Sequence, residues 1–319
     1  MRTVLAVDAG GTTTRAVLLD ETGRCLGVGR AGAGNPIASG RPMAMASLVS
    51  ALVGAWSSRP DASPELVLVT MAGAITMDDL AGEEYRLADA GITARVEFEA
   101  DILSAWFSGT ASGEGTVLVV GTGAVAGVVS GGRLARVVDG IGWLLGDAGS
   151  GFWIGREVAR AVAEDLDGRG PATALTDAVM AMVGETSGRP GAGRGDASHR
   201  LLRFAYSGSP VELAKFAPLA LAAVDDPVAR DIVARAAAQV ERTARAAVDP
   251  ASEDLIVLAG GLLGEGSALA ERVMGVFGER CVRVESGLAG AALLALRHLG
   301  VRAGEAELGR IRESLAEVG

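Results

Sequence analysis

The sequence predicts an α/β protein of two domains, each built on a mixed β-sheet that is covered by helices. Three observations lead to this prediction. The chain has 319 residues, about twice the length of an ordinary domain. A pattern of three short strands joined by glycine-rich turns occurs twice, at residues 3–28 and 116–138, which indicates a duplication. Strand-like and helix-like segments alternate along most of the chain, as they do where helices cover a sheet.

The first unit starts with an apolar, β-branched segment at Thr3–Asp8, which predicts a buried strand. A turn at Gly10–Gly11 leads to a second strand, Thr14–Leu19, and a turn at Glu21–Arg24 leads to a third, Cys25–Val28. Hydrophobic patterning then predicts a helix, two further strands and a short helix, at Met43–Ser57, Leu66–Thr70, Arg95–Glu99 and Ile102–Phe107.

The second unit repeats this order after a turn-rich stretch at Ser112–Gly115. Its strands and turns are expected at Thr116–Val120, Gly121–Gly123, Ala124–Val129, Ser130–Arg133 and Leu134–Val138. A mostly helical region follows at Gly151–Asp249, with a loop at residues 185–200. A short strand and two helices come next, at Leu255–Leu258, Ser267–Phe277 and Gly290–Leu299. We expect an N-terminal domain of residues 1–113 and a C-terminal domain of residues 114–319 that helices enlarge.

Composition excludes several classes of protein. The net charge of −10 and the pI near 4.9 argue against nucleic acid or an anionic membrane as the main partner. No apolar run approaches the roughly 18 residues that span a bilayer, and the first residues resemble a strand rather than a secretory signal, so we expect a cytosolic protein. With two cysteines and two histidines, the chain has too few ligands to favour a disulfide framework, a zinc site or an iron–sulfur cluster. Lys215 is the only lysine, and no glycine precedes it, which excludes a GxxxxGK[ST] phosphate loop.

The turn of the first unit has the composition of a phosphate site. It reads Asp8-Ala9-Gly10-Gly11-Thr12-Thr13-Thr14. Glycines let the main chain approach an anion and point its N–H groups at it, and the carboxylate of Asp8 suits a hydrated magnesium ion. An ordinary tight hairpin is the simpler interpretation, but it seldom needs an acid, two glycines and three hydroxyls together. We favour the phosphate interpretation.

The turn of the second unit, Gly121-Thr122-Gly123, does not fit a dinucleotide-binding fold. Its glycine spacing is GxGxxxG, and a strand follows it rather than the helix that would receive a pyrophosphate. A second phosphate hairpin, equivalent to the first, explains this turn better.

Four other segments could contribute to a site. Asp101 follows a strand and opens a helix, where a helix N-cap and a general base are equally good interpretations. A glycine loop from Asp139 to Gly151 carries Trp143 and Asp147; each alone suggests a core residue or a turn, but together they favour a polar small-molecule site. The remaining two segments are Asn35-Pro36, a turn signal, and Gly260-Gly261, either a strand-to-helix turn or a surface for adenosine.

Together these motifs resemble the sugar kinase–actin–Hsp70 superfamily and, within it, the N-acetylglucosamine kinase and BadF/BadG-type ATPase family. The resemblance covers almost the whole chain. Its motifs are DAGGTTTRAVL, VLVVGTGAVAG, VLAGGLLGEG, GWLLGDAGSGFWIGRE and the short Met71-Ala72-Gly73-Ala74. It implies two RNase H-like (actin-like ATPase) domains with a cleft between them, an ATP- and Mg²⁺-dependent transfer of phosphate to the 6-hydroxyl of an amino sugar, and a homodimer.

The resemblance also implies roles for single residues. Asp101 would be the base that takes the hydroxyl proton and would contact the sugar, and Asp8 would position the magnesium ion. The residues that would bind ATP are Gly10, Gly11, Thr12, Thr13, Thr122, Gly123, Gly260 and Gly261. The residues that would bind the sugar, besides Asp101 and Thr122, are Asn35, Gly142, Trp143 and Asp147.

Three positions depart from the family's pattern. Members often carry a polar residue after GTG, and some hold the sugar with an asparagine two positions on, where this chain has Ala124 and Val125. The base commonly follows asparagine or threonine, whereas Ala100 precedes Asp101 here. The departures leave open which amino sugar is the substrate, whether N-acetylglucosamine, glucosamine or N-acetylmuramic acid, and they leave phosphoryl transfer untouched.

Two other functions share this fold. An ATPase that activates 2-hydroxyacyl-CoA dehydratases needs two suitably placed cysteines in each chain, whereas Cys25 and Cys281 lie far apart in the sequence. A nucleotide-dependent sensor has no need of a base, and the presence of both Asp8 and Asp101 argues against it.

Overall fold

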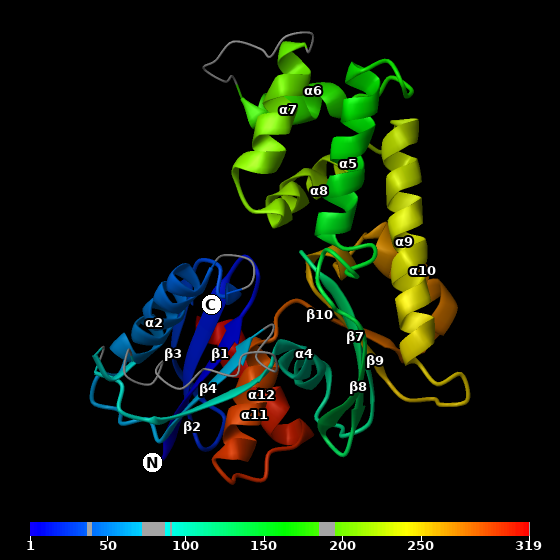
Figure 1. The fold of residues 1–319 in the computed structure, drawn as a ribbon. Coiled ribbons are helices and arrows are strands. Elements are labelled where there is room, and N and C mark those ends of the chain that lie inside the picture. Colours follow the sequence, from blue (N-terminus) through cyan, green and yellow to red (C-terminus); the bar gives the residue numbers. More distant parts are fainter. Residues whose placement is uncertain (37–39, 72–86, 90, 185–194, 319) are drawn as a thin grey trace.

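The computed structural model describes residues 1–36, 40–71, 87–89, 91–184 and 195–318. It contains two five-stranded mixed sheets with helices around them (Figure 1). The strands of the first sheet are β1 (Thr3–Ala9), β2 (Thr14–Asp20), β3 (Cys25–Ala31), β4 (Leu66–Met71) and β5 (Arg95–Ala100). Those of the second are β6 (Gly115–Val120), β7 (Ala124–Ser130), β8 (Arg133–Asp139), β9 (Ile256–Ala259) and β10 (Cys281–Val284).

The two sheets have the same topology, which confirms the duplication. Their strand orders are β3-β2-β1-β4-β5 and, written from the other edge, β8-β7-β6-β9-β10. In each sheet the first three strands form an antiparallel meander, and the last two run parallel to the first. The sequence analysis did not include β10, whose four residues are only partly buried.

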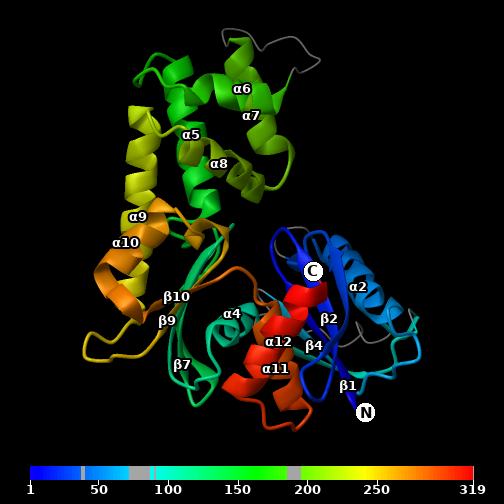
Figure 2. The same ribbon diagram turned by 180° about the vertical axis from the view of Figure 1, so that it is seen from behind.

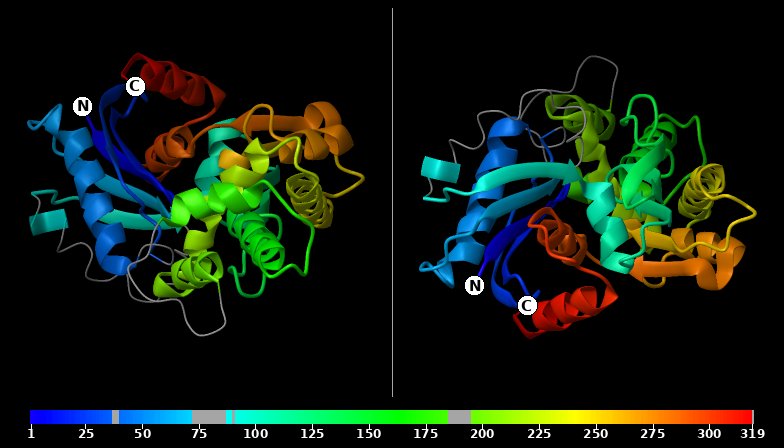
Figure 3. Two further views of the ribbon diagram at one scale, coloured as in Figure 1. Left: turned by 90° about the horizontal axis from the view of Figure 1, so that it is seen from above. Right: turned by 90° about the horizontal axis from the view of Figure 1, so that it is seen from below.

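The helices form layers on these sheets. Their bounds are α2 (Arg41–Ser57), α4 (Asp101–Gly109), α5 (Gly151–Leu166), α6 (Leu175–Val183), α7 (Asp196–Ser207), α8 (Ala217–Ala222), α9 (Pro227–Ala247), α10 (Ala268–Phe277), α11 (Leu288–His298) and α12 (Glu305–Val318). Figure 2 shows α5 to α8 gathered beyond one end of the second sheet, with α9 and α10 beside it. Figure 3 shows α2 on one face of the first sheet and α11 and α12 on the other. No helix of the described ranges is both long and apolar enough to cross a membrane.

The helices α4 and α11 occupy equivalent places in the two units and exchange partners. The helix α4 follows β5 of the first sheet but packs on β6, β9 and β10 of the second. Conversely, α11 follows β10 but packs on β1, β2 and β4 of the first sheet, and α12 continues there against β3. The predicted division at residues 113 and 114 groups α11 and α12 with the second sheet, whereas both pack on the first. One hydrophobic core therefore joins both sheets through these helices.

The two exchanged helices touch through their backbones at Gly290. Its N–H donates a hydrogen bond to Ser108 Oγ at 2.8 Å. A Cβ on Gly290 would lie 1.9 Å from the carbonyl oxygen of Ser104 and 2.5 Å from the backbone nitrogen of Ser108. Only glycine permits so close a crossing, because real Cβ atoms do not approach backbone to such distances.

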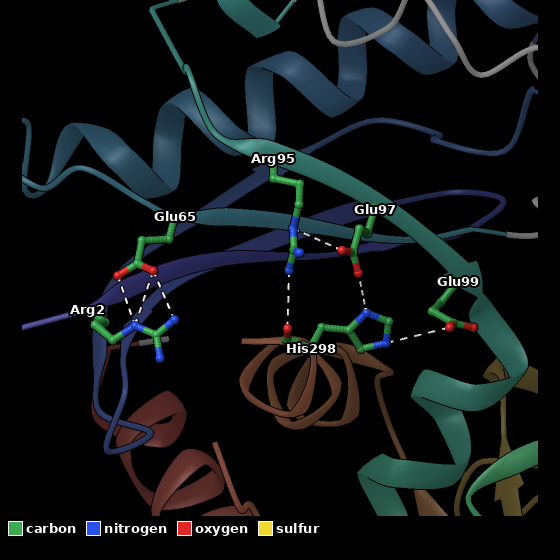
Figure 4. A network of polar contacts seen from close by, with 6 residues as sticks. All are labelled: Arg2, Glu65, Arg95, Glu97, Glu99 and His298. Carbon is green, nitrogen blue, oxygen red and sulfur yellow. Dashed lines mark hydrogen bonds and ion pairs between the residues drawn. The ribbon is translucent and has the colours of Figure 1, made fainter. Parts of the chain in front are cut away.

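Side chains of β5 fasten the other end of α11 (Figure 4). The ring of His298 lies between the carboxylates of Glu97, which pairs with Nδ1, and Glu99, whose Oε1 is 3.6 Å from Nε2. Arg95 donates to the carbonyl oxygen of His298 at 3.2 Å and pairs with Glu97 at 3.0 Å. The two ends of α11 are thereby fixed to the first sheet, since its start contacts Asp8 of β1.

We expect Gly290→Ala to destabilise the protein by about 2–3 kcal/mol, because overpacking forces the backbones of α4 and α11 apart. The free energy of unfolding is measured by urea denaturation. The matched control is Gly309→Ala in α12, where an added Cβ meets nothing within 4 Å; it should be neutral or stabilise by up to about 1 kcal/mol through helix propensity. Equal effects of both substitutions would contradict the close crossing.

Candidate active site

The turn between β1 and β2 is held by backbone hydrogen bonds and by the segment that follows β3. Gly10 N–H donates to the carbonyl oxygen of Thr13 at 3.0 Å, and Gly34 N–H donates to that of Gly10 at 3.0 Å. A Cβ on Gly34 would lie 2.4 Å from Thr14 Oγ1. Gly34 therefore packs against the turn, and Asn35, a predicted sugar-binding residue, is the next residue in the chain. The side chain of Thr12 is exposed and that of Thr13 half-buried.

The turn between β6 and β7 receives the start of α5. Gly151 N–H donates to the carbonyl oxygen of Gly121 at 2.8 Å, and Phe152 N–H donates to that of Thr122 at 3.1 Å. The helix itself begins after Ser150, whose Oγ accepts from Trp153 N–H at 3.2 Å. The glycine loop and the second turn therefore form one backbone-bonded unit.

The two turns lie against each other. A Cβ on Gly11 would be 3.4 Å from Thr122 Oγ1, an ordinary van der Waals distance. Two segments more than a hundred residues apart are thus brought together where both sheets end. Their glycines and hydroxyls can face one anion, as the two predicted phosphate turns require.

Asp8 and Asp101 lie beside these turns. Asp8 Oδ2 accepts from the backbone N–H of Gly287 at 3.0 Å and from Ser286 Oγ at 3.4 Å, at the start of α11. Burial raises the pKa of Asp8, and Arg15, its cross-strand neighbour on β2, opposes that rise. Ser286 and Gly287 were not among the predicted site residues. In the sequence they could have been recognised as a turn-forming Ser-Gly pair before an apolar helix.

Asp101 is the first residue of α4, and its carboxyl group does not cap the helix. The N-cap is Ala100, and no side chain forms a cap hydrogen bond. Burial, and next the negative charge of Asp8, raise the pKa of Asp101 to about 6, although the N–H of Ile102 favours the charged form. The structure therefore does not support the N-cap interpretation, and a carboxyl group with this pKa can accept a proton near neutral pH.

The glycine loop presents Asp147 to the second turn. Asp147 Oδ1 accepts from Ala124 N–H at 3.1 Å, and a Cβ on Gly123 would lie 3.0 Å from the same oxygen. Gly142 is exposed with φ +84°, and the half-buried Trp143 ring packs 5.5 Å from the ring of Phe152. Asp147 is thus beside Thr122 and Gly123, while the ring of Trp143 packs on the start of α5.

Position 260 requires glycine because of its backbone conformation and its close contact with the end of β6. Its φ is +91°, and a Cβ would lie 2.4 Å from the carbonyl oxygen of Val120. This contact places the end of β9 beside the second turn. Gly261 follows at an exposed position, where an added Cβ would meet nothing within 4 Å. Of the motif Met71–Ala74, only Met71, at the end of β4, lies within the described residues. The predicted loop at 185–200 is wrong at its end, because residues 196–200 form the start of α7, and residues 185–194 lie outside the described residues.

The donor set at the site fits a hydrated magnesium ion. Asp8 and Asp101 are carboxylates near enough for Asp8 to raise the pKa of Asp101, and a cation beside them offsets that repulsion. Across the described ranges, no three His, Cys, Asp or Glu residues gather as a metal cage. Magnesium keeps most of its waters and needs only one or two carboxylates, so this small set suffices.

Comparisons with known proteins agree with this fold. The model of the BadF/BadG/BcrA/BcrD ATPase family matches residues 5–295. A protein from Chromobacterium violaceum assigned as an N-acetylglucosamine kinase has a similar structure, with a TM-score of 0.71 and 25% identity over 92% of this chain and 99% of that one. A ROK family glucokinase from Streptomyces griseus, with glucose and AMPPNP bound, shares the fold at a TM-score of 0.54 and 20% identity, over 92% and 99% of the two chains. The two-domain actin-like ATPase fold is therefore confirmed.

One curated relative adds a sequence match. Glucosamine kinase GspK from Vibrio cholerae is 29% identical over 184 residues, which are 56% of this chain and 61% of that protein. The match thus spans about three fifths of the relative's length.

The raised pKa of Asp101 predicts a pH-dependent cost in stability. Between about pH 4 and 6 the unfolded chain loses this proton while the folded protein retains it, so stability falls as pH rises through that window. Asp101→Asn removes the charge and should stabilise the protein by on the order of 2 kcal/mol at pH 7.5. Urea denaturation at pH 4 and pH 7.5 measures the difference, which should nearly vanish at pH 4.

The control is Asp196→Asn. Asp196 is likewise the first residue of a helix, α7, but its side chain is 60% exposed and pairs with Arg200. This variant should show no gain at pH 7.5. A gain of Asp101→Asn that is equal at both pH values would contradict the burial of a charged Asp101.

Proposed function

Because the chain belongs to the BadF/BadG/BcrA/BcrD ATPase family, we propose that it is an ATP-dependent kinase of an amino sugar. The product would be the 6-phosphate of N-acetylglucosamine or of a close relative such as glucosamine or N-acetylmuramic acid. The observation that supports this proposal best is the pair Asp8 and Asp101 beside two touching glycine turns. The named activities of the relatives from C. violaceum and V. cholerae support an amino sugar as acceptor.

Phosphoryl transfer asks the protein mainly to position groups and to stabilise charge. Asp101 takes the proton of the sugar 6-hydroxyl as that oxygen forms a bond to the γ-phosphorus. The bond between the γ-phosphorus and its bridging oxygen breaks, and ADP leaves. The N–H groups of Gly10 and Gly121 donate within their own turns. The N–H groups of Gly11 to Thr13 and of Thr122 and Gly123 would stabilise the negative charge on the phosphates.

Asp8 would hold a magnesium ion, which would neutralise charge on the phosphates when bound. Its own hydrogen bonds come from Ser286 and Gly287, at the start of α11. The positive end of that helix and the two donors keep the Asp8 carboxylate in one orientation. The same aspartate raises the pKa of Asp101, so the ion site and the base are electrostatically linked.

Sugar recognition would fall to the glycine loop and to Asn35. Asp147 accepts one backbone hydrogen bond and has further acceptor capacity for sugar hydroxyls. Val125, where some relatives have asparagine, does not offer a polar group. A Cβ on Gly140 would lie 2.6 Å from its Cγ2, so this side chain packs under the loop. Val125 therefore supports the loop and leaves sugar contacts to the loop's own residues.

An ATP-consumption assay with Mg²⁺ tests the proposal. The acceptors are N-acetylglucosamine, glucosamine, N-acetylmuramic acid and glucose, and consumption should depend on at least one amino sugar. ATP consumption that is unaffected by any sugar would contradict the kinase proposal and favour an ATPase without sugar kinase activity.

Asp101→Asn should lower kcat by about 100-fold or more, the usual effect of removing a general base. The fold should stay intact, and the Asp196→Asn control should keep wild-type turnover. Steady-state kinetics on the best sugar measure both variants. Unchanged turnover in Asp101→Asn would exclude this residue as the base.

A further inference from the structure

Asp139, the last residue of β8, binds the glycine loop from inside. Its Oδ1 accepts from Gly140 N–H at 2.8 Å and from Asp147 N–H at 2.7 Å, and its Oδ2 accepts from Ala148 N–H at 3.0 Å. One carboxylate thus joins Gly140, near the start of the loop, to Asp147 and Ala148, near its end. Three hydrogen bonds from backbone N–H groups to one carboxyl group are a strong anchor for the loop.

The loop holds both of its aspartates in a strained conformation. Asp139 has φ +62° and Asp147 has φ +55°, and they are the only non-glycine residues in the described part of the chain with positive φ. Side chains rarely adopt this region, and such strain persists only where surrounding contacts determine it. The carboxylate of Asp139 supplies such contacts, since it binds the N–H of Gly140, the residue after Asp139, and the N–H of Asp147.

The loop also closes tightly around this carboxylate. A Cβ on Gly146 would lie 2.2 Å from Asp139 Oδ1 and 2.6 Å from a carbon of Ile141. Glycine at position 146 is therefore required for the Asp139 carboxylate to occupy the interior of the loop. A side chain there would displace it and break the link to Asp147.

We propose that Asp139 is a positioning residue for sugar binding: its carboxylate fixes Asp147 beside the second turn, where Asp147 binds the sugar hydroxyls. This inference rests on the proposed function. The chain of contacts is short. Asp139 binds the N–H of Asp147, Asp147 Oδ1 binds the N–H of Ala124, and the same oxygen lies against Gly123. Loss of Asp139 removes the acceptor for the N–H groups of Asp147 and of Ala148, and it leaves the Asp147 backbone with the bond from Ser150 N–H to its carbonyl oxygen.

The chain contains a natural control for this role. Asp20, at the end of β2, anchors a turn in the same way: its Oδ1 accepts from the N–H of Thr22 at 2.9 Å, from Thr22 Oγ1 at 2.6 Å and from the N–H of Arg24 at 3.2 Å. That turn lies at the opposite end of the first sheet from the candidate site. Removal of Asp20 therefore tests loss of a turn anchor without a change near Asp147.

The test compares Asp139→Ala, Gly146→Ala and Asp20→Ala in sugar-dependent ATP consumption. Asp139→Ala and Gly146→Ala should raise KM for the sugar about tenfold or more, with kcat within about threefold and KM for ATP unchanged, because uniform sugar binding is lost. Asp139→Asn, whose amide oxygen can accept the bonds from Gly140 and Asp147, should recover part of that affinity. Asp20→Ala should leave KM for the sugar unchanged. Wild-type KM for the sugar in folded Asp139→Ala would overturn the proposal.

A double-mutant cycle with Asp147→Ala separates positioning from general stability. If Asp139 acts through Asp147, Asp139→Ala should raise KM for the sugar by less than about twofold in the Asp147→Ala background. A full tenfold increase in that background would overturn the proposed route.

Amide hydrogen exchange keeps this inference distinct from the proposed function. Asp139→Ala should speed exchange at Gly140, Asp147 and Ala148, and Asp20→Ala should not. If the wild-type protein phosphorylates no sugar, the proposed function fails, and exchange still decides whether Asp139 fixes the loop. Unchanged exchange at these three amides in Asp139→Ala would overturn the inference by itself.

Discussion

The crossing of α4 and α11 determines where every other part of the site lies. Each helix follows one sheet in the sequence and packs on the other, and their backbones meet at Gly290. Both helices begin at the same end of the molecule. The start of α4 carries Asp101, and the start of α11 donates two hydrogen bonds to Asp8. The exchange thus brings two carboxylates together, and it also brings the two sheets close enough for Gly11 to meet Thr122.

This arrangement buries the carboxyl groups of Asp8 and Asp101 close to each other, which lowers the stability of the folded protein. Burial raises the pKa of both carboxyl groups, and the charge of Asp8 adds to the rise at Asp101. Arg15 and the start of α11 offset part of the cost at Asp8. At Asp101, the contacts of the described residues that oppose the rise come from the backbone N–H groups of Ile102 and of Asp101 itself. A group left in this state suits proton transfer near neutral pH, and proteins commonly sacrifice stability at such positions.

The sequence predicted nine of the ten described strands, because turn residues bound them and most are apolar, β-branched runs, and the repeat located both meanders. It did not predict the exchange of α4 and α11. The apolar pattern of residues 290–299 shows that a helix is buried, but not which sheet buries it. The sequence did not predict β10, because its four residues are only partly buried. The question of whether Asp101 caps its helix also needed the structure, since the residue type suits both roles. Asp139 stood inside a recognised motif, but its role depends on three backbone contacts that spacing does not reveal.

The two units of the duplication supply different parts of the site. The turn of the first unit follows a carboxylate, Asp8, whereas the equivalent strand of the second unit is followed directly by Gly121. Conversely, in the described residues β3 of the first unit is followed by α2, while β8 of the second leads into the glycine loop and α5. The first unit therefore contributes Asp8 and Asp101, and the second contributes the loop with Asp147. Because Asp101 and Asp147 come from different units, their separation depends on the packing of α4 against α11, and we expect a change in that crossing to move Asp101 relative to the loop.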